Sequence, residues 1–324
     1  MFSIPELEHL QEAQARISGS LHRTPAVSSH ALSERVGRTV ILKCENLQKT
    51  GSFKVRGALN SILELDDVAR GRGVVAASAG NHAQAVAWAA ARAGVSATVV
   101  MPANALPTKV RASEGYGAEV ILQGTVFEAF DVALEVAQDR GLTFLHPFDD
   151  PLIVAGQGTL GLEVLDDVPD AATVVVPVGG GGLISGVALA VANLAPAARV
   201  YGVEPHGACA MRKSLEKGEA IRLESIDTIA DGLGAPMAGE LTYEVVRRHV
   251  EDVVLVSDDE IRKAMAFILA RTKLLVEPAG AAGVAALLAG RIPLAAGPVV
   301  AILSGGNVDL DRLADLLGSA GAGL

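Results

Sequence analysis

The 324-residue sequence contains little cysteine, few aromatic residues and no excess of basic charge. Its two cysteines, Cys44 and Cys209, provide neither a disulfide framework nor a metal-binding spacing, as is typical of proteins of the reducing cytosol. Aromatic residues make up 3% of the chain and the formal net charge is −10, which disfavours a nucleic-acid-binding surface. No apolar run of membrane-spanning length is free of charge, proline or glycine, and residues 1–20 lack a signal-peptide core. We therefore expect a soluble cytoplasmic protein that binds neither nucleic acid nor membrane.

Strand-like segments alternate with helical ones along the whole chain, which is typical of an α/β protein with mostly parallel sheets. A chain of this length usually divides into two domains. The clearest expected helix covers 258–272, where Ser257 and Glu260 form a capping box and Ile261, Met265 and Ile268 line one face. The expected strands are residues 40–44, 74–77, 97–101, 119–122, 173–178, 200–203, 252–256 and 299–303.

Lys54 follows a glycine turn at the start of an expected helix. Ser52 can serve as the N-cap of the apolar run 53–65, which would place Lys54 in the first turn, near the positive end of the helix dipole. An amine at this position could hold the aldehyde of a cofactor. The alternative is that Lys54 is one more lysine on a solvated helix end.

Three further motifs follow expected buried strands. Residues 78–84 lead into an alanine-rich helix and offer backbone N–H groups to a carboxylate or phosphate, although Ser-Ala-Gly-Asn is also an ordinary turn. Residues 179–182 are four consecutive glycines before a helix, which lets the backbone approach a phosphate closely. Residues 304–307 follow the last strand. Because ligands gather at the carboxyl ends of parallel strands, we expect these motifs and Lys54 to form one site.

The motifs of nucleotide enzymes and zinc proteases are missing. The tetraglycine segment is not G-x-G-x-x-G, because the third glycine would fall on Ile184 or Ser185. The sequence contains no G-x-x-x-x-G-K-[ST], and its seven histidines form no H-E-x-x-H. A small phosphorylated cofactor therefore fits better than a dinucleotide or a nucleoside triphosphate.

In combination, residues 49–57, 78–84, 179–183 and 304–309 resemble the second fold type of pyridoxal-phosphate enzymes, in its threonine dehydratase and serine racemase branch. The resemblance covers about residues 24–310 and is closest to threonine dehydratases without a C-terminal regulatory domain. It implies a tryptophan synthase β-like fold of two mostly parallel open-sheet domains with the cofactor in the cleft between them. Residues 1–72 and 149–324 would form the large domain, and 73–148 a small mobile domain.

The resemblance also implies roles for individual residues. Lys54 would form the Schiff base with pyridoxal 5′-phosphate, Phe53 would pack near the ring, Asn81 would bind the ring hydroxyl and Ser304 would face the pyridine nitrogen. The phosphate would be held by the amides of Gly179, Gly180, Gly181, Gly182 and Leu183. The substrate carboxylate would be held by Ser78, Ala79, Gly80, Asn81 and His82.

The implied reaction is β-elimination from a hydroxy amino acid by a threonine or serine dehydratase (ammonia-lyase). We favour L-threonine, giving 2-oxobutanoate and ammonia, with L-serine giving pyruvate, because Phe148 offers an apolar neighbour for the threonine methyl. Serine racemisation is disfavoured, since Ala79 stands where racemases carry a serine hydroxyl that protonates the α-carbon. Threo-3-hydroxyaspartate is another candidate substrate, and a non-catalytic ligand sensor on the same fold is the alternative of another class.

Part of the family binds a divalent cation, whose ligands would map to Glu204 and the carbonyl of Ala208. Ala210 replaces the third ligand, a carboxylate, which weakens such a site. Some relatives bind a nucleotide effector at the positions of Ser28, Ser29, Lys49 and Thr50. The resemblance also implies a homodimer or homotetramer.

Overall fold

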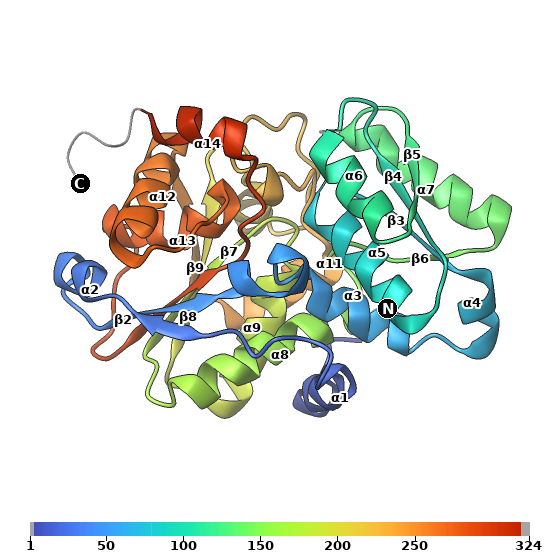
Figure 1. Cartoon of the computed structure of the whole chain (residues 1–324). Coiled ribbons are helices and arrows are strands. Elements are labelled where there is room, and N and C mark those ends of the chain that lie inside the picture. Colours follow the sequence, from blue (N-terminus) through green and yellow to red (C-terminus); the bar gives the residue numbers. More distant parts are fainter. Residues whose placement is uncertain (1–2, 79, 106, 319–324) are drawn as a thin grey trace.

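The computed structural model describes residues 3–78, 80–105 and 107–318, which form two sheets flanked by helices (Figure 1). The larger sheet has the strand order β1-β2-β10-β7-β8-β9, and all neighbours are parallel except β1 and β2. The smaller sheet has the order β5-β4-β3-β6 and is entirely parallel. The strands are β1 Ala26–Ser28, β2 Val40–Cys44, β3 Val74–Ala77, β4 Ala97–Met101, β5 Glu119–Leu122, β6 Thr143–Phe144, β7 Thr173–Pro177, β8 Arg199–Pro205, β9 Asp252–Val256 and β10 Val299–Leu303.

Helices cover both faces of each sheet, as parallel sheets require. The α-helices are α1 Leu7–Ile17, α2 His30–Val36, α3 Lys54–Leu63, α4 Asp67–Arg72, α5 Asn81–Ala93, α6 Pro107–Gly115, α7 Val126–Arg140, α8 Pro151–Asp167, α9 Gly182–Leu194, α10 Ala210–Lys217, α11 Glu240–His249, α12 Asp258–Thr272, α13 Pro278–Leu288 and α14 Leu310–Leu317. Three 3₁₀ turns are η1 Glu45–Leu47, η2 Lys49–Gly51 and η3 Asp231–Leu233. In Figure 1 the smaller sheet lies on the right with α5, α6 and α7, in cyan and green.

Alternation along the central strand β10 divides the core of the larger sheet into two layers. Val299, Ala301 and Leu303 pack with α12 and α13 on one face, whereas Val300 and Ile302 pack with α8 and α9 on the other. Successive strand residues point to opposite faces, so a strand covered on both sides is apolar throughout. All five residues of β10 are buried accordingly.

Helix α3, which begins at Lys54, lies between the two parts of the molecule. One side packs into the core of the smaller sheet through residues such as Val55 and Leu59. The other side meets α8 at Gly57 and Gly156, where a Cβ built on Gly156 would lie 2.6 Å from the Gly57 Cα. Such an approach leaves no room for a side chain. The position of Lys54 therefore depends on packing from both sides.

A buried ion network also holds α3. The Arg56 side chain, in a residue that is 1% exposed, binds Glu45 in two hydrogen bonds of 2.8 Å each. It also donates to Glu163 at 2.8 and 3.0 Å, and Lys43 pairs with the same carboxylate at 2.8 Å. Although burial opposes it, the charges of the two glutamates raise the pKa of Arg56. The network joins α3 to η1 and α8.

The fold class predicted from the sequence is confirmed. Every predicted strand is present within about two residues, and the 258–272 helix with its capping box is confirmed. The short strands β1 and β6 were missed. The N-cap prediction for Ser52 is wrong: Phe53 precedes α3 without a side-chain cap, and Ser52 instead bridges to Gly305. In the described part of the chain, no helix has the length and apolarity needed to cross a membrane.

Candidate active site

A cavity of about 770 Å³ lies between the two sheets, where β3, β4, β7 and β10 end. The residues that the sequence assigned to cofactor or substrate line it, apart from Ala79, which lies outside the described residues. They are Phe53, Lys54, Ser78, Gly80, Asn81, His82, Gly179, Gly180, Gly181, Gly182, Leu183 and Ser304. Four segments distant in the sequence thus meet at one cavity, as the strand-end argument predicted.

The Lys54 amine lies in this cavity. Its Nζ donates to the carbonyl oxygen of Pro147 at 2.8 Å and lies 5.3 Å from the centre of the Phe53 ring. Burial lowers the pKa of Lys54 to about 8, because a charged amine loses solvation there. A larger share of this amine is therefore neutral near pH 7 than of an exposed lysine, and only a neutral amine can attack a carbonyl.

The tetraglycine turn forms a tight cradle at the start of α9. Gly181 precedes the helix with φ +96°, a conformation that side-chain-bearing residues rarely adopt. A Cβ on Gly180 would lie 2.3 Å from the Phe148 ring, and the Gly180 carbonyl accepts a 2.7 Å hydrogen bond from Thr242 Oγ1. The first N–H groups of a helix have no intrahelical acceptor. The turn therefore suits a phosphate group, and a side chain at Gly180 or Gly181 would disrupt it.

Asn81, the first residue of α5, is held by two side chains from the other side of the cavity. Its Nδ2 donates to Glu277 Oε1 at 2.6 Å, and its Oδ1 accepts from Asn307 Nδ2 at 2.9 Å. These bonds fix which way the amide faces and leave one Nδ2 hydrogen free for a ligand. Burial, reinforced by the charge of Asp231, raises the pKa of Glu277 to about 7. Glu277 was not predicted from the sequence, since an acidic residue before a proline at a helix start gives no sign of a cavity.

Two histidines beside the cavity are neutral at pH 7. His82 Nε2 lies 3.1 Å from the carbonyl oxygen of Leu145, and burial together with the charge of Lys54 lowers the pKa of His82 to about 3. Burial and Lys54 likewise lower the pKa of His146 to about 4. A carboxylate on the loop around Ser78 would therefore meet backbone N–H groups and the N-terminus of α5 rather than an imidazolium.

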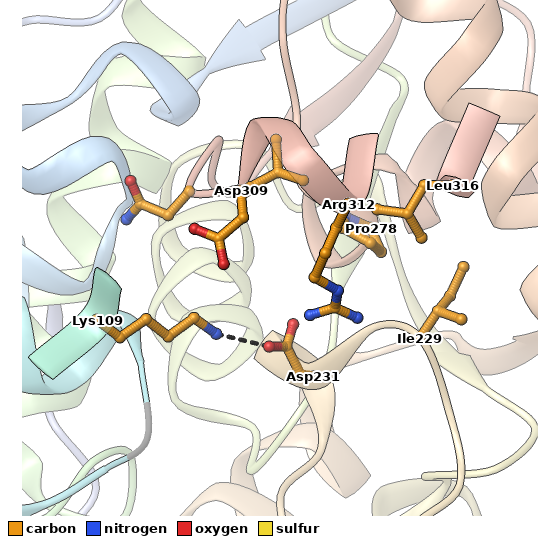
Figure 2. Close-up of a pocket in the computed structure, with 9 residues that line it drawn as sticks. Lys109, Ile229, Asp231, Pro278, Asp309, Arg312 and Leu316 are labelled. Atoms are coloured by element: carbon orange, nitrogen blue, oxygen red, sulfur yellow. Dashed lines mark hydrogen bonds and ion pairs between the residues drawn. The ribbon is translucent and has the colours of Figure 1, made fainter. Parts of the chain in front are cut away.

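Contacts between α6 and the opposite side bridge the rim of the cavity. Figure 2 shows Lys109 reaching to Asp231, with Asp309 and Arg312 beside them. Lys109 Nζ lies 2.6 Å from Asp231 Oδ2, and Thr108 Oγ1 donates to Asp309 Oδ2 at 3.2 Å. Neither Lys109 nor Asp231 was assigned a role from the sequence.

The donor set does not fit the expected divalent-cation site. Glu204 is fully buried, and its two carboxylate oxygens accept the backbone N–H groups of Met211 and Arg212 at 2.9 and 2.8 Å. The carboxylate thus fixes the start of α10, and burial raises its pKa to about 8. Ala208 adds only a backbone carbonyl. Among the described residues, no group of three or more acidic, histidine or cysteine side chains could hold a metal ion.

The expected effector residues do not come together within one chain. Ser28 pairs with Ile41 near the start of β2, whereas Lys49 and Thr50 follow its carboxyl end. Ser29 Oγ caps α2 by accepting from Leu32 N–H at 3.4 Å. A strand of five residues separates the two pairs, which is about 15 Å.

Comparisons with known proteins agree with this geometry. Residues 17–305 match a family described as pyridoxal-phosphate dependent enzyme. An L-threonine ammonia-lyase of Thermotoga maritima is 47% identical over 95% of this chain and 77% of its own length. A catabolic L-threonine dehydratase of Escherichia coli is 43% identical over 96% of both chains. The solved structure of maize serine racemase has a TM-score of 0.93 at 42% identity and covers 98% of each chain. The chain therefore belongs to the pyridoxal-phosphate dependent enzymes, in their second fold type.

Proposed function

We propose that this protein is an ammonia-lyase that converts L-threonine to 2-oxobutanoate and ammonia, and L-serine to pyruvate and ammonia. The convergence of Lys54, the tetraglycine turn and the loop around Ser78 in one cavity carries the proposal. The names of the relatives from Thermotoga maritima and Escherichia coli, at 47% and 43% identity, support this choice of substrate.

The cavity has the groups that pyridoxal phosphate needs. Lys54 Nζ would hold the aldehyde, the turn at 179–183 the phosphate, and the free Nδ2 hydrogen of Asn81 the ring hydroxyl. Ser304, 3% exposed at the end of β10, would face the ring nitrogen, and Phe53 would pack near the ring. When bound, the cofactor withdraws electrons from the α-carbon of an amino acid and so weakens the bonds at that carbon.

The residues of this chain would then position the substrate and move one proton. The loop of Ser78, Gly80 and His82 would bind the carboxylate, and Ala79 would belong to this loop by its place in the sequence. The Lys54 amine, with its pKa lowered to about 8, would take the proton from the α-carbon as a general base. The hydroxyl of Ser304, unlike a carboxylate, would supply no negative charge to the ring nitrogen, so the ring would draw electrons from the substrate less strongly than beside an aspartate.

We also propose that residues 73–148 form a small mobile domain and residues 1–72 with 149–324 a large one. The four strands of the smaller sheet all fall within 74–144, which supports the division. Closure of the small domain would expel water from the cavity and bring the Ser78 loop onto the substrate. The rim contacts of Lys109 and Thr108 are the ones that closure would form.

The Lys54→Ala variant tests the assignment. The wild type with pyridoxal phosphate should be yellow, should release 2-oxobutanoate from L-threonine, and should carry the pyridoxyl group on the peptide of Lys54 after borohydride reduction. The variant should lose the label and the activity. A colourless wild type, or a label on another peptide, would contradict the proposal; binding without release of 2-oxo acid would favour a ligand sensor.

Serine racemisation is the second candidate, because of the similarity to maize serine racemase. Ala79 has no proton to deliver to the second face of the α-carbon. We expect little D-serine from the wild type and an increase in the Ala79→Ser variant. Equal racemisation by both proteins would remove this argument.

Regulation and assembly are separate proposals. No step is assigned to a divalent cation, since both oxygens of Glu204 are in use, and a chelator is expected to leave the activity unchanged. We propose a homodimer or homotetramer and a nucleotide effector that binds near residues 28–29 or 49–50. Sedimentation with and without ATP or AMP tests both the assembly and the effector.

A further inference from the structure

More than half of the phenylalanines of the chain lie at the proposed active site. The chain has seven phenylalanines, and four of them, Phe53, Phe127, Phe130 and Phe148, line the cavity. Phe53 belongs to the Lys54 turn. The other three lie next to the smaller sheet. Phe127 and Phe130 are three residues apart on α7, and Phe148 follows β6. In a chain with 3% aromatic residues, this distribution calls for a functional reason.

The rings of Phe148 and Phe130 form an aromatic wall that starts beside the Lys54 amine, and they are joined through His146, which does not itself line the cavity. The carbonyl that accepts from Lys54 Nζ belongs to Pro147, next to Phe148. The Phe148 ring packs edge-on to His146 with centroids 4.7 Å apart, and His146 packs edge-on to Phe130 at 5.3 Å. Phe130 also packs on Phe144 at 5.1 Å, a ring that does not line the cavity. The wall therefore extends from the reacting centre to α7.

The charges around the cavity make this wall unsuited to an acidic side chain. Among the described residues that line the cavity, Lys54 and Lys109 are the basic ones, and no arginine is present. Lys109 is already paired with Asp231, which lines the cavity as well. Arg222 does not line the cavity, and its Cζ lies over the Phe127 ring, 5.4 Å from the centre. A carboxylate against Phe130 or Phe148 would lose its water with no lining arginine to pair with, whereas an alkyl group would gain from leaving water.

We propose that Phe130 and Phe148 form the subsite for the substrate side chain and restrict the enzyme to 3-hydroxy amino acids that carry only hydrogen or an alkyl group beside the hydroxyl. The inference rests on the proposed function and specifies its substrate class. Threonine fits, and so does 2-amino-3-hydroxypentanoate, which would give 2-oxopentanoate and ammonia. Threo-3-hydroxyaspartate is excluded. Each added methylene is expected to raise kcat/KM about fourfold while the wall still has room for it.

The first experiment uses the wild-type holoenzyme and needs no variant. We expect kcat/KM for threonine to exceed that for serine about fourfold or more, 2-amino-3-hydroxypentanoate to be at least as good as serine, and 3-hydroxyaspartate to be at least about 100-fold poorer than threonine. Calorimetry with unreactive analogues gives a second readout, in which L-2-aminobutyrate should bind more tightly than L-aspartate. Turnover of 3-hydroxyaspartate within tenfold of threonine would overturn the proposal.

Variants then test the wall directly. Phe130→Ala should lower kcat/KM for threonine about tenfold and for serine less than about threefold, and Phe130→Leu should keep most of the preference. Phe144→Ala is the matched control, because Phe144 packs on the same ring outside the cavity, and it should leave the threonine-to-serine ratio unchanged. If Phe130→Ala lowers kcat/KM equally for threonine and serine, the proposed subsite is wrong. If the wild type releases 2-oxo acid from none of these compounds, the proposed function is wrong, and not only the proposed subsite.

Discussion

Removing the charge of Lys109 tests whether the rim contacts hold the cavity closed. Lys109 and Asp231 lie 2.6 Å apart with side chains 16% and 46% exposed, so solvent weakens the pair to about 0.2–1 kcal/mol. Lys109→Met keeps the length of the side chain and removes the energy of the ion pair. If the pair stabilises the closed form that binds substrate, KM for threonine should rise about 1.4-fold to fivefold. Steady-state kinetics at low and high salt measure the effect, and the wild type should lose affinity as salt rises while the variant responds less.

A second ion pair, which lies beside the smaller sheet and away from the cavity, serves as the control. Arg140 and Glu119 also lie 2.6 Å apart and are exposed, but the pair does not span the cavity. Arg140→Met should leave KM and its salt dependence unchanged. In a double-mutant cycle, Lys109→Met and Asp231→Asn should have a combined effect smaller than the sum of the two. Additive effects, or a KM as sensitive to Arg140→Met as to Lys109→Met, would refute the reasoning.

Three further predictions concern buried charges near Lys54. Burial and Asp231 raise the pKa of Glu277 to about 7, so the folded protein keeps a proton that the unfolded chain releases near about pH 4.3. As pH rises between those values, the free energy of unfolding of the wild type should therefore fall by up to about 1.4 kcal/mol per pH unit relative to that of Glu277→Gln. Urea unfolding at pH 5, 6 and 7 measures this, and free energies that change equally in both proteins would contradict it. Arg56→Met leaves Glu45 and Glu163 without their cation and should lower the free energy of unfolding by about 3–5 kcal/mol, whereas a loss below about 1 kcal/mol would show that the network is dispensable. Uptake of pyridoxal phosphate by the apoenzyme should accelerate as pH rises through about 8, where the Lys54 amine becomes neutral, and a rate independent of pH from 6 to 9 would speak against it.

The sequence was sufficient to predict the elements of the fold because the buried strands carry unbroken β-branched or aliphatic runs. The segments at 74–77 and 299–303 are covered by helices on both faces, so their apolar character is continuous and easy to recognise. β1 escaped notice because it has three residues, of which two are exposed. The prediction that Ser52 caps α3 was wrong because Ser52 forms a β-bridge with Gly305. That contact depends on the packing of segments that are distant in the sequence.

The site was predictable where its residues adjoin strand ends and unpredictable where they depend on long-range packing. The motifs around Lys54, Ser78, Gly179 and Ser304 each follow a strand, so the parallel topology alone brings them together. Glu277 and Lys109 reach the cavity from a helix start and a helix side. Local sequence carries no sign of that, since the partner Asn81 lies 196 residues from Glu277.

The position of β10 has a consequence for how the chain folds during synthesis. This strand, at residues 299–303, lies between β2 and β7 in the larger sheet. Until it leaves the ribosome, β2 has no parallel neighbour, whereas β3 to β6 and their helices are already complete. Contacts that span more than 250 residues also form slowly. We therefore expect the smaller sheet to fold first, and pulse-labelled hydrogen exchange that protects β2 before β3 and β4 would contradict that order.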